Sequence, residues 1–114
     1  MGKRILVCDD KMFLRYLLRD ILEEAGHQVI GEAENGEDLL IKYRTLKPDL
    51  VTLDITMPVM TGLEALKRLM EIDPQAKVLM VSAMAQKKMV LDAINTGAKG
   101  FISKPFKADK IVES

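Results

Sequence analysis

Four short apolar runs, rich in Val, Ile and Leu, each end directly before a reactive polar side chain. The runs cover residues 5–8, 50–53, 78–81 and 101–103. Short apolar runs that are separated by helix-length segments are typical of buried parallel strands. Ligands of an open α/β sheet bind just outside the carboxyl ends of its strands. We therefore expect three carboxylates, a hydroxyl and an ammonium group to converge on one edge of a sheet, from Asp9, Asp10, Asp54, Ser82 and Lys104.

Segments with the apolar spacing of helices separate these runs. The first segment covers residues 13–25 and ends before Gly26, and a shorter strand over residues 29–33 follows it. Strands and helices that alternate five times over predict a parallel sheet that is covered on both faces. The boundaries expected for the later helices are Asn35 as an N-cap, Pro48, Gly62, Pro74 and Gly97.

The length of 114 residues suits one domain with a single core, so we take residues 1–114 as one domain. Its last segment is the weakest element. From Ala108 onward only two helical turns can form, and two turns are marginal without extensive packing. The final helix is therefore expected to be short or truncated.

The composition narrows the class of protein. Charged residues balance at 17 of each sign, which gives no reason to expect nucleic acid or an anionic membrane surface as a partner. The single cysteine, Cys8, excludes an internal disulfide and fits a reducing compartment. No apolar stretch approaches the ~20 residues of a membrane span. We therefore expect a cytoplasmic protein with no direct nucleic acid contact and no membrane insertion.

The three aspartates suggest a metal. Asp9, Asp10 and Asp54 would repel one another at the same edge of a sheet unless a cation joined them. Mg²⁺ usually takes one or two carboxylates together with waters and substrate phosphate, and needs no complete protein cage. Zinc is disfavoured because His27 and Cys8 are the chain's sole histidine and cysteine. The residues alone therefore predict a Mg²⁺ site.

A carboxylate beside such a metal can also act as a nucleophile and form an aspartyl phosphate. Asp54 is the better candidate because it stands alone after its strand, which leaves Asp9 and Asp10 for the metal. Lys104 would supply a positive charge to one phosphoryl oxygen, and the Ser82 hydroxyl would donate to another. This arrangement predicts phosphoryl transfer to Asp54.

At these positions the sequence resembles the receiver domains of response regulators, and in style the stand-alone chemotaxis regulators among them. The resemblance covers about residues 3–107, and it is specific because several weak motifs occur together at these spacings. It implies a flavodoxin-like (βα)5 fold, a doubly wound parallel five-stranded sheet with strand order 2-1-3-4-5. The motifs that carry it are Asp9-Asp10, the segment Asp54-Ile55-Thr56-Met57-Pro58-Val59-Met60-Thr61-Gly62, Ser82-Ala83 and Lys104-Pro105-Phe106.

The resemblance implies a role for each aspartate. Asp54 would be the phosphoacceptor and would take its phosphoryl group from a histidine kinase. Asp10 and Asp54 would bind Mg²⁺ through their side chains, Asp9 would help to place the metal, and Thr56 would contribute its backbone carbonyl. The chain would therefore be a phosphoacceptor that assists its own phosphorylation, and not an enzyme.

The resemblance also implies a two-state switch. Ser82 and Lys104 would hold the phosphoryl oxygens, and the peptide bond before Pro105 would be cis. Phosphorylation would draw the Ser82 hydroxyl inward, and Phe101 would turn into the space that it leaves. Chemotaxis regulators typically carry Tyr at this position, and Phe101 has no hydroxyl to offer to a partner.

The output face would consist of the fourth helix, the fifth strand and the fifth helix. It would bind a downstream protein, such as a flagellar motor switch component, or an effector domain. Lysines gather in this last third of the chain. They either form a solvated face or favour an acidic or amphipathic partner segment. These residues are Lys87, Lys88, Lys99, Lys107 and Lys110.

Three other interpretations stay open at this point. The chain could be a receiver that was cut from a multidomain regulator, for example a transcriptional one. A haloacid-dehalogenase-type phosphatase also uses an aspartate nucleophile, but it normally needs a second Asp where this chain has Thr56. A flavodoxin-like cofactor binder would need a phosphate-cradling first loop, whereas residues 9–11 carry two carboxylates that would repel phosphate.

Overall fold

The computed structural model describes residues 2–55, 57, 59–82 and 86–103. Its strands form one parallel sheet in the order β2-β1-β3-β4-β5, which confirms the predicted α/β fold and strand order. The strands are β1 (Arg4–Cys8), β2 (Gln28–Ala33), β3 (Leu50–Asp54), β4 (Val78–Ser82) and β5 (Gly100–Ser103).

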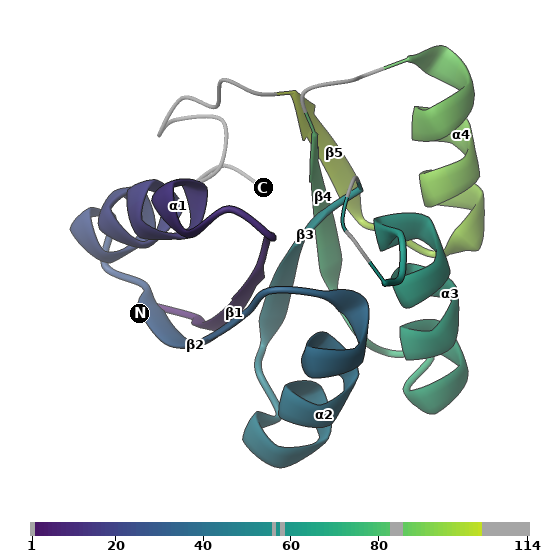
Figure 1. Ribbon diagram of the computed structural model, residues 1–114. Coiled ribbons are helices and arrows are strands. Elements are labelled where there is room, and N and C mark those ends of the chain that lie inside the picture. The colour runs from purple at the N-terminus through teal and green to yellow at the C-terminus, as the bar shows by residue number, and fades with distance from the viewer. Residues whose placement is uncertain (1, 56, 58, 83–85, 104–114) are drawn as a thin grey trace.

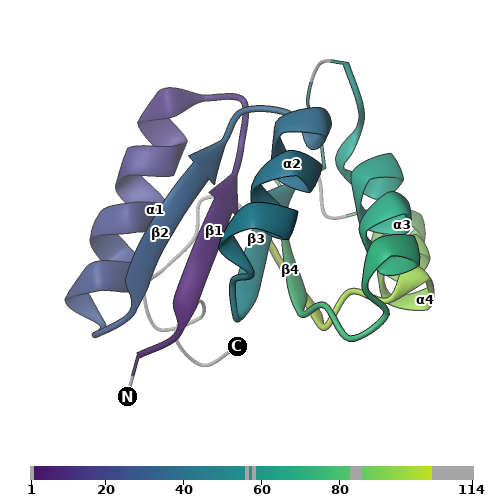
Figure 2. The ribbon, with the colours of Figure 1, turned by 90° about the horizontal axis from the view of Figure 1, so that it is seen from below.

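The four helices within the described residues lie on both faces of the sheet (Figure 1; Figure 2). One helix, α1, lies on one face, and α2, α3 and α4 lie on the other. Within the described ranges, no helix is long and apolar enough to cross a membrane. The segment expected to form a fifth helix lies outside the described residues. The described helices are α1 (Met12–Glu24), α2 (Gly36–Leu46), α3 (Gly62–Ile72) and α4 (Lys87–Thr96).

The helix boundaries follow local chemistry and confirm the sequence predictions. Asn35 caps α2, because its side-chain oxygen accepts the N–H of Asp38 at 2.9 Å. The third helix begins at Gly62, as expected. Two helices are followed by glycines in the left-handed region, Gly26 with φ 94° after α1 and Gly97 with φ 130° after α4.

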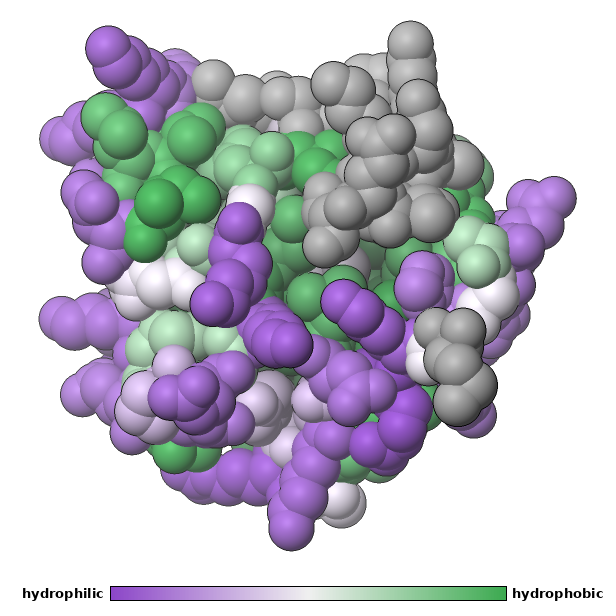
Figure 3. All heavy atoms as spheres, turned by 180° about the vertical axis from the view of Figure 1, so that it is seen from behind, coloured by the Kyte–Doolittle hydropathy of each residue, from purple (hydrophilic) through white to green (hydrophobic). Residues whose placement is uncertain are grey.

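Two apolar layers hold the sheet between the helices. The layer beneath α1 takes from that helix the buried side chains of Leu18 and Leu22. Phe13 is 73% exposed, because a helix that lies on a sheet buries one stripe of its surface. Apolar side chains also remain on the surface of α4, as Figure 3 shows, and Leu91 and Ile94 are among them.

Candidate functional site

The carboxyl ends of the strands bring the predicted polar residues together. Asp9 directly follows β1, Asp54 is the last residue of β3, and Ser82 is the last residue of β4. All three are buried, with exposed fractions of 6%, 4% and 1%. The apolar strand pattern placed them correctly, because in a parallel sheet consecutive strands end at the same edge.

Asp9, Asp10 and Asp54 form an acidic cluster. Each of them offers one carboxylate oxygen, and these atoms lie within 4.8 Å of one another. The donor set is hard oxygen only, which fits Mg²⁺. Asp10 also accepts a hydrogen bond from the Lys11 ammonium at 3.3 Å, and this bond and the Asp10 charge raise the pKa of Lys11. The cluster can hold a cation that neutralises its mutual repulsion.

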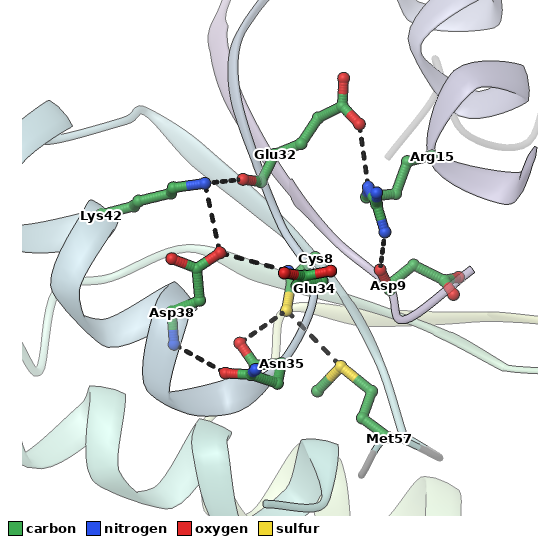
Figure 4. A network of polar contacts seen from close by, with 9 residues as sticks. All are labelled: Cys8, Asp9, Arg15, Glu32, Glu34, Asn35, Asp38, Lys42 and Met57. Atoms are coloured by element: carbon green, nitrogen blue, oxygen red, sulfur yellow. Dashed lines mark hydrogen bonds and ion pairs between the residues drawn. The ribbon is translucent and has the colours of Figure 1, made fainter. Parts of the chain in front are cut away.

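Three hydrogen bonds fix Asp9 in the turn between β1 and α1. Its N–H donates to the carbonyl oxygen of Ala33 on β2 at 3.0 Å. Its Oδ1 accepts the N–H of Lys11 at 3.0 Å. Its own carbonyl oxygen accepts from Nη1 of Arg15 at 2.7 Å, as Figure 4 shows. The position of Asp9 therefore depends on β2 and α1 as well as on its own strand.

Sequence reasoning did not single out the charged residues around this turn. Arg15 pairs with Glu32 on β2 at 2.9 Å, and Arg19 pairs with the same carboxylate at 3.0 Å. On the other side of β2, Lys42 contacts the Glu32 carbonyl oxygen and the Asp38 carboxylate (Figure 4). In the sequence, the only sign of this role is that Arg15 lies about one turn into the helix that follows the acidic pair Asp9-Asp10. This pattern does not distinguish Arg15 from a basic residue on any solvent-exposed helix face.

The loop from β3 to α3 brings a helix start against the backbone of Asp54. The Gly62 N–H donates to the carbonyl oxygen of Ile55 at 2.7 Å. A Cβ on Gly62 would lie 2.1 Å from the Asp54 carbonyl oxygen, so only glycine fits there. In the same loop Val59 has φ 70°, which is strained for a β-branched residue. The loop is therefore packed tightly at one end and strained in its middle.

The thiol of Cys8 lies behind the acidic cluster. It is buried, and its Sγ lies 3.6 Å from both the Asn35 carbonyl oxygen and Sδ of Met57. Burial raises the pKa of Cys8 strongly, and the charges of Asp9, Asp38 and Asp54 raise it further. Because the thiolate is the reactive form, this cysteine is an inert core residue.

Phe101 and His27 lie outside the acidic cluster. Phe101 of β5 is partly buried and packs against the apolar layer beneath α2, α3 and α4. His27 takes no part in the acidic cluster, and its Nδ1 accepts the N–H of Lys3 at 3.0 Å. Thr56, Lys104 and Pro105 lie outside the described residues.

Comparisons with known proteins agree with this geometry. Residues 5–114 match the response regulator receiver domain family. The chain is 54% identical to the chemotaxis protein CheY of Thermotoga maritima, over 100% of this chain and 95% of that protein. It is 53% identical to the chemotaxis protein CheY of Bacillus subtilis over the same shares.

Solved structures point the same way. The crystal structure of the CheX-CheY-BeF3-Mg²⁺ complex from Borrelia burgdorferi matches with a TM-score of 0.94 and 39% identity, over 96% of this chain and 84% of that chain. Neither a phosphatase nor a flavodoxin-like cofactor binder accounts for matches of this extent. The chain belongs to the response regulator receiver domain family, as a CheY-type chemotaxis receiver that is a phosphoacceptor of two-component signalling and not an enzyme.

Proposed function

We propose that Asp54 is the residue that accepts the phosphoryl group, and that a histidine kinase is the donor. The observation that carries this proposal is the position of Asp54, which ends a buried strand beside two further carboxylates. Asp10 is partly exposed and pairs with Lys11, so it suits a metal ligand better than a nucleophile. Asp9 is also buried, but its Oδ1 already accepts the Lys11 N–H in the turn after β1. Of the three carboxylates, only that of Asp54 belongs to the last residue of a strand.

Mg²⁺ is the cofactor of this reaction, because the cluster offers only carboxylate oxygens at a close spacing. When bound, the ion neutralises the charge that gathers on a transferred phosphoryl group. Asp10 and Asp54 would hold it through their side chains, Asp9 would help to place it, and Thr56 would contribute its backbone carbonyl oxygen. The relative from Borrelia burgdorferi was crystallised with Mg²⁺, which supports the same choice here.

Ser82 and Lys104 hold the oxygens of the phosphoryl group on Asp54. The hydroxyl of Ser82 lies at the end of β4, the strand that pairs with β3 next to Asp54. Lys104 directly follows β5, and the peptide bond between it and Pro105 is cis in this proposal. Phe101 then packs into the space that Ser82 leaves, and so carries the signal to β5.

The output of the switch is a change in protein binding on α4, β5 and the last segment of the chain. Lys87 and Lys88 begin α4, and both are exposed. The apolar patch of Figure 3 lies on the same helix, so this face offers a mixed basic and apolar surface. Such a surface suits an acidic or amphipathic segment of a cytoplasmic chemotaxis protein, such as a flagellar motor switch component. The structure of a CheX–CheY complex supports partners of this class.

Labelling with radioactive acetyl phosphate tests the phosphoacceptor directly. We expect the wild-type chain to incorporate phosphate in the presence of Mg²⁺ and to lose this labelling when the ion is chelated. The Asp54→Asn variant keeps the shape of the side chain and should take up no label.

Asp92→Asn is the matched control, because it changes an exposed aspartate on α4 in the same way. It should label as the wild type does. Equal labelling of the wild type and Asp54→Asn, or no labelling of the wild type, would contradict the proposal.

A further inference from the structure

Arg15 lies between the acidic cluster and the charges of β2, and the proposed chemistry does not use it. Its Nη1 donates to the carbonyl oxygen of Asp9 at 2.7 Å, and its Nε donates to Oε1 of Glu32 at 2.9 Å. The side chains of Arg15 and Glu32 are only 12% and 19% exposed. Figure 4 shows the guanidinium between both partners. One side chain thus joins α1, β2 and the end of β1.

The carbonyl oxygen that Arg15 holds belongs to the peptide group between Asp9 and Asp10. Because this group is planar, a fixed oxygen also fixes the N–H of Asp10 and restrains the backbone that carries its carboxylate. On the other side of Asp9, its N–H is bound to the carbonyl oxygen of Ala33 at 3.0 Å. The two anchors leave the acidic pair little freedom to turn.

We propose that Arg15, oriented by Glu32, is a positioning residue for the Mg²⁺ site. It holds the peptide group between Asp9 and Asp10 so that both carboxylates face Asp54 before the ion arrives. The inference rests on the Mg²⁺ binding proposed above. Like charges within 4.8 Å repel one another, and without the anchor the turn would open and separate them. A preformed site then binds its ion without the cost of ordering the ligands.

Charge alone predicts the opposite effect. A guanidinium close to the acidic cluster repels an approaching cation, so its removal should strengthen Mg²⁺ binding if only the charge matters. If Arg15 positions the ligands, its removal should weaken Mg²⁺ binding. The sign of the change therefore separates the two explanations.

The test is a calorimetric titration of Mg²⁺ into the unphosphorylated chain, which needs no phosphoryl transfer. Arg15→Met keeps an apolar stem but removes the donors and the charge. We expect its Kd for Mg²⁺ to be about tenfold higher than that of the wild type, as for other groups that orient metal ligands. Arg15→Lys keeps the charge but lacks the planar fork that reaches both partners, so its Kd should rise by about threefold.

Arg19→Met is the matched control. Arg19 lies one turn further along α1 and pairs with the other oxygen of Glu32 at 3.0 Å, whereas Arg15 is the residue that donates to the Asp9 carbonyl oxygen. The variant removes the same charge and leaves the anchor of the peptide group intact. Its Kd should stay within about twofold of the wild type, because Arg15 still holds the Asp9 carbonyl oxygen in this variant.

The outcomes are distinct. Mg²⁺ binding by Arg15→Met that equals or exceeds that of the wild type would overturn the inference, and so would an equal loss in Arg19→Met. If circular dichroism shows that Arg15→Met does not fold, Arg15→Lys decides, and a wild-type Kd would overturn the inference. Failure of the wild-type chain itself to bind Mg²⁺ would instead refute the proposed metal site, and the inference with it.

Discussion

The two ends of the sheet are built in opposite ways. At the amino end, the guanidinium of Arg4 donates to the carbonyl oxygens of Leu46, the last residue of α2, at 2.9 Å and of Lys47, its C-cap, at 2.8 Å. The Asp49 carboxylate in turn accepts the N–H of Arg4 at 2.9 Å. At the carboxyl end, the acidic cluster brings like charges within 4.8 Å. Hydrogen-bond donors and acceptors are paired at the amino end, whereas like charges lie close together in the acidic cluster at the carboxyl end.

Residues that stabilise the fold and residues that serve phosphorylation therefore lie at opposite ends of the strands. The amino end is complete without any ligand, because its charges and helix carbonyls satisfy one another. At the carboxyl end a bound cation would add stability, because it would join carboxylates that repel one another. Substitutions at the amino end should therefore change the free energy of unfolding alone, and those at the carboxyl end should also change phosphorylation.

The largest effect is expected from Gly62→Ala at the carboxyl end. The new Cβ would lie 2.1 Å from the Asp54 carbonyl oxygen and 2.6 Å from the Cα of Ile55, so α3 or β3 must move. We expect a loss of about 3 kcal/mol in the free energy of unfolding, as for severe overpacking. Labelling by acetyl phosphate should fall as well, because the displaced backbone carries Asp54. Urea unfolding and labelling measure the two effects.

Gly26→Ala is the corresponding change at the amino end. Gly26 has φ 94°, but a Cβ there would meet no atom within 4 Å. The loss should be about 1 kcal/mol, which is the cost of the left-handed conformation for alanine. Labelling should be unchanged. Gly62 is required by the close approach of neighbouring backbone, and Gly26 by its left-handed conformation. Equal losses of unfolding free energy in Gly62→Ala and Gly26→Ala would contradict this distinction.

Arg4→Met tests the pairing at the amino end. The variant leaves the last carbonyl groups of α2 without their cationic donor, and it removes the favourable charge at the helix C-terminus. We expect a loss of about 1.5 kcal/mol in the free energy of unfolding, with unchanged phosphate uptake. Lys3→Met removes a neighbouring exposed charge and should cost much less. A loss of labelling in Arg4→Met would show that the two ends are coupled.

Asp10→Asn tests the repulsion at the carboxyl end. Without Mg²⁺ the variant should be more stable than the wild type by about 1 kcal/mol, because one of three close carboxylate charges is gone. At a Mg²⁺ concentration ten times its Kd, the wild type should gain about 1.4 kcal/mol and the variant much less. The order of stability should therefore reverse when Mg²⁺ is added.

Asp20→Asn is the control for this reversal. Asp20 is exposed on α1, outside the acidic cluster, so its substitution should leave the Mg²⁺ response of the wild type intact. Urea unfolding with and without Mg²⁺ measures all three proteins. An Asp10→Asn variant that is less stable than the wild type without Mg²⁺ would rule out the repulsion.

Periodicity and strand ends are local signals, and they were sufficient for the strands and for the positions of Asp9, Asp54 and Ser82 at their ends. The strand order came from the resemblance to receiver domains, because apolar spacing does not specify which strands are neighbours. The sequence was insufficient for the bonds that hold the site. Arg15 meets Glu32 across 17 positions of the chain, and Arg4 meets Lys47 across 43. In the linear sequence, neither Arg15 nor Arg4 can be distinguished from an ordinary charged residue on the surface. Polar contacts between residues that are far apart in the sequence depend on how α1 and α2 lie on the sheet. The spacing of the apolar residues does not specify this arrangement.

The smallest effect is expected from Tyr43, which joins α2 to the end of α3 on the amino side of the sheet. Its hydroxyl donates to Oδ2 of Asp73 at 2.7 Å. Burial, together with the hydrogen bond to Asp73 and the charge of its carboxylate, raises the pKa of Tyr43 from 10.0 to about 12. The folded chain therefore holds the phenolic proton more tightly than the unfolded chain does.

The sign of the pH dependence follows from this shift. The contribution of Tyr43 to stability is complete below pH 10.0, and it is lost as the pH rises through about 12. Urea unfolding of the wild type and of Tyr43→Phe across this range should show the stability advantage of the wild type shrinking. In a Tyr16→Phe background, the absorbance of Tyr43 reports the same ionisation directly, because the chain has only two tyrosines. An advantage that does not change with pH would mean that the amino end is held by packing, and that the bond to Asp73 contributes nothing to its stability.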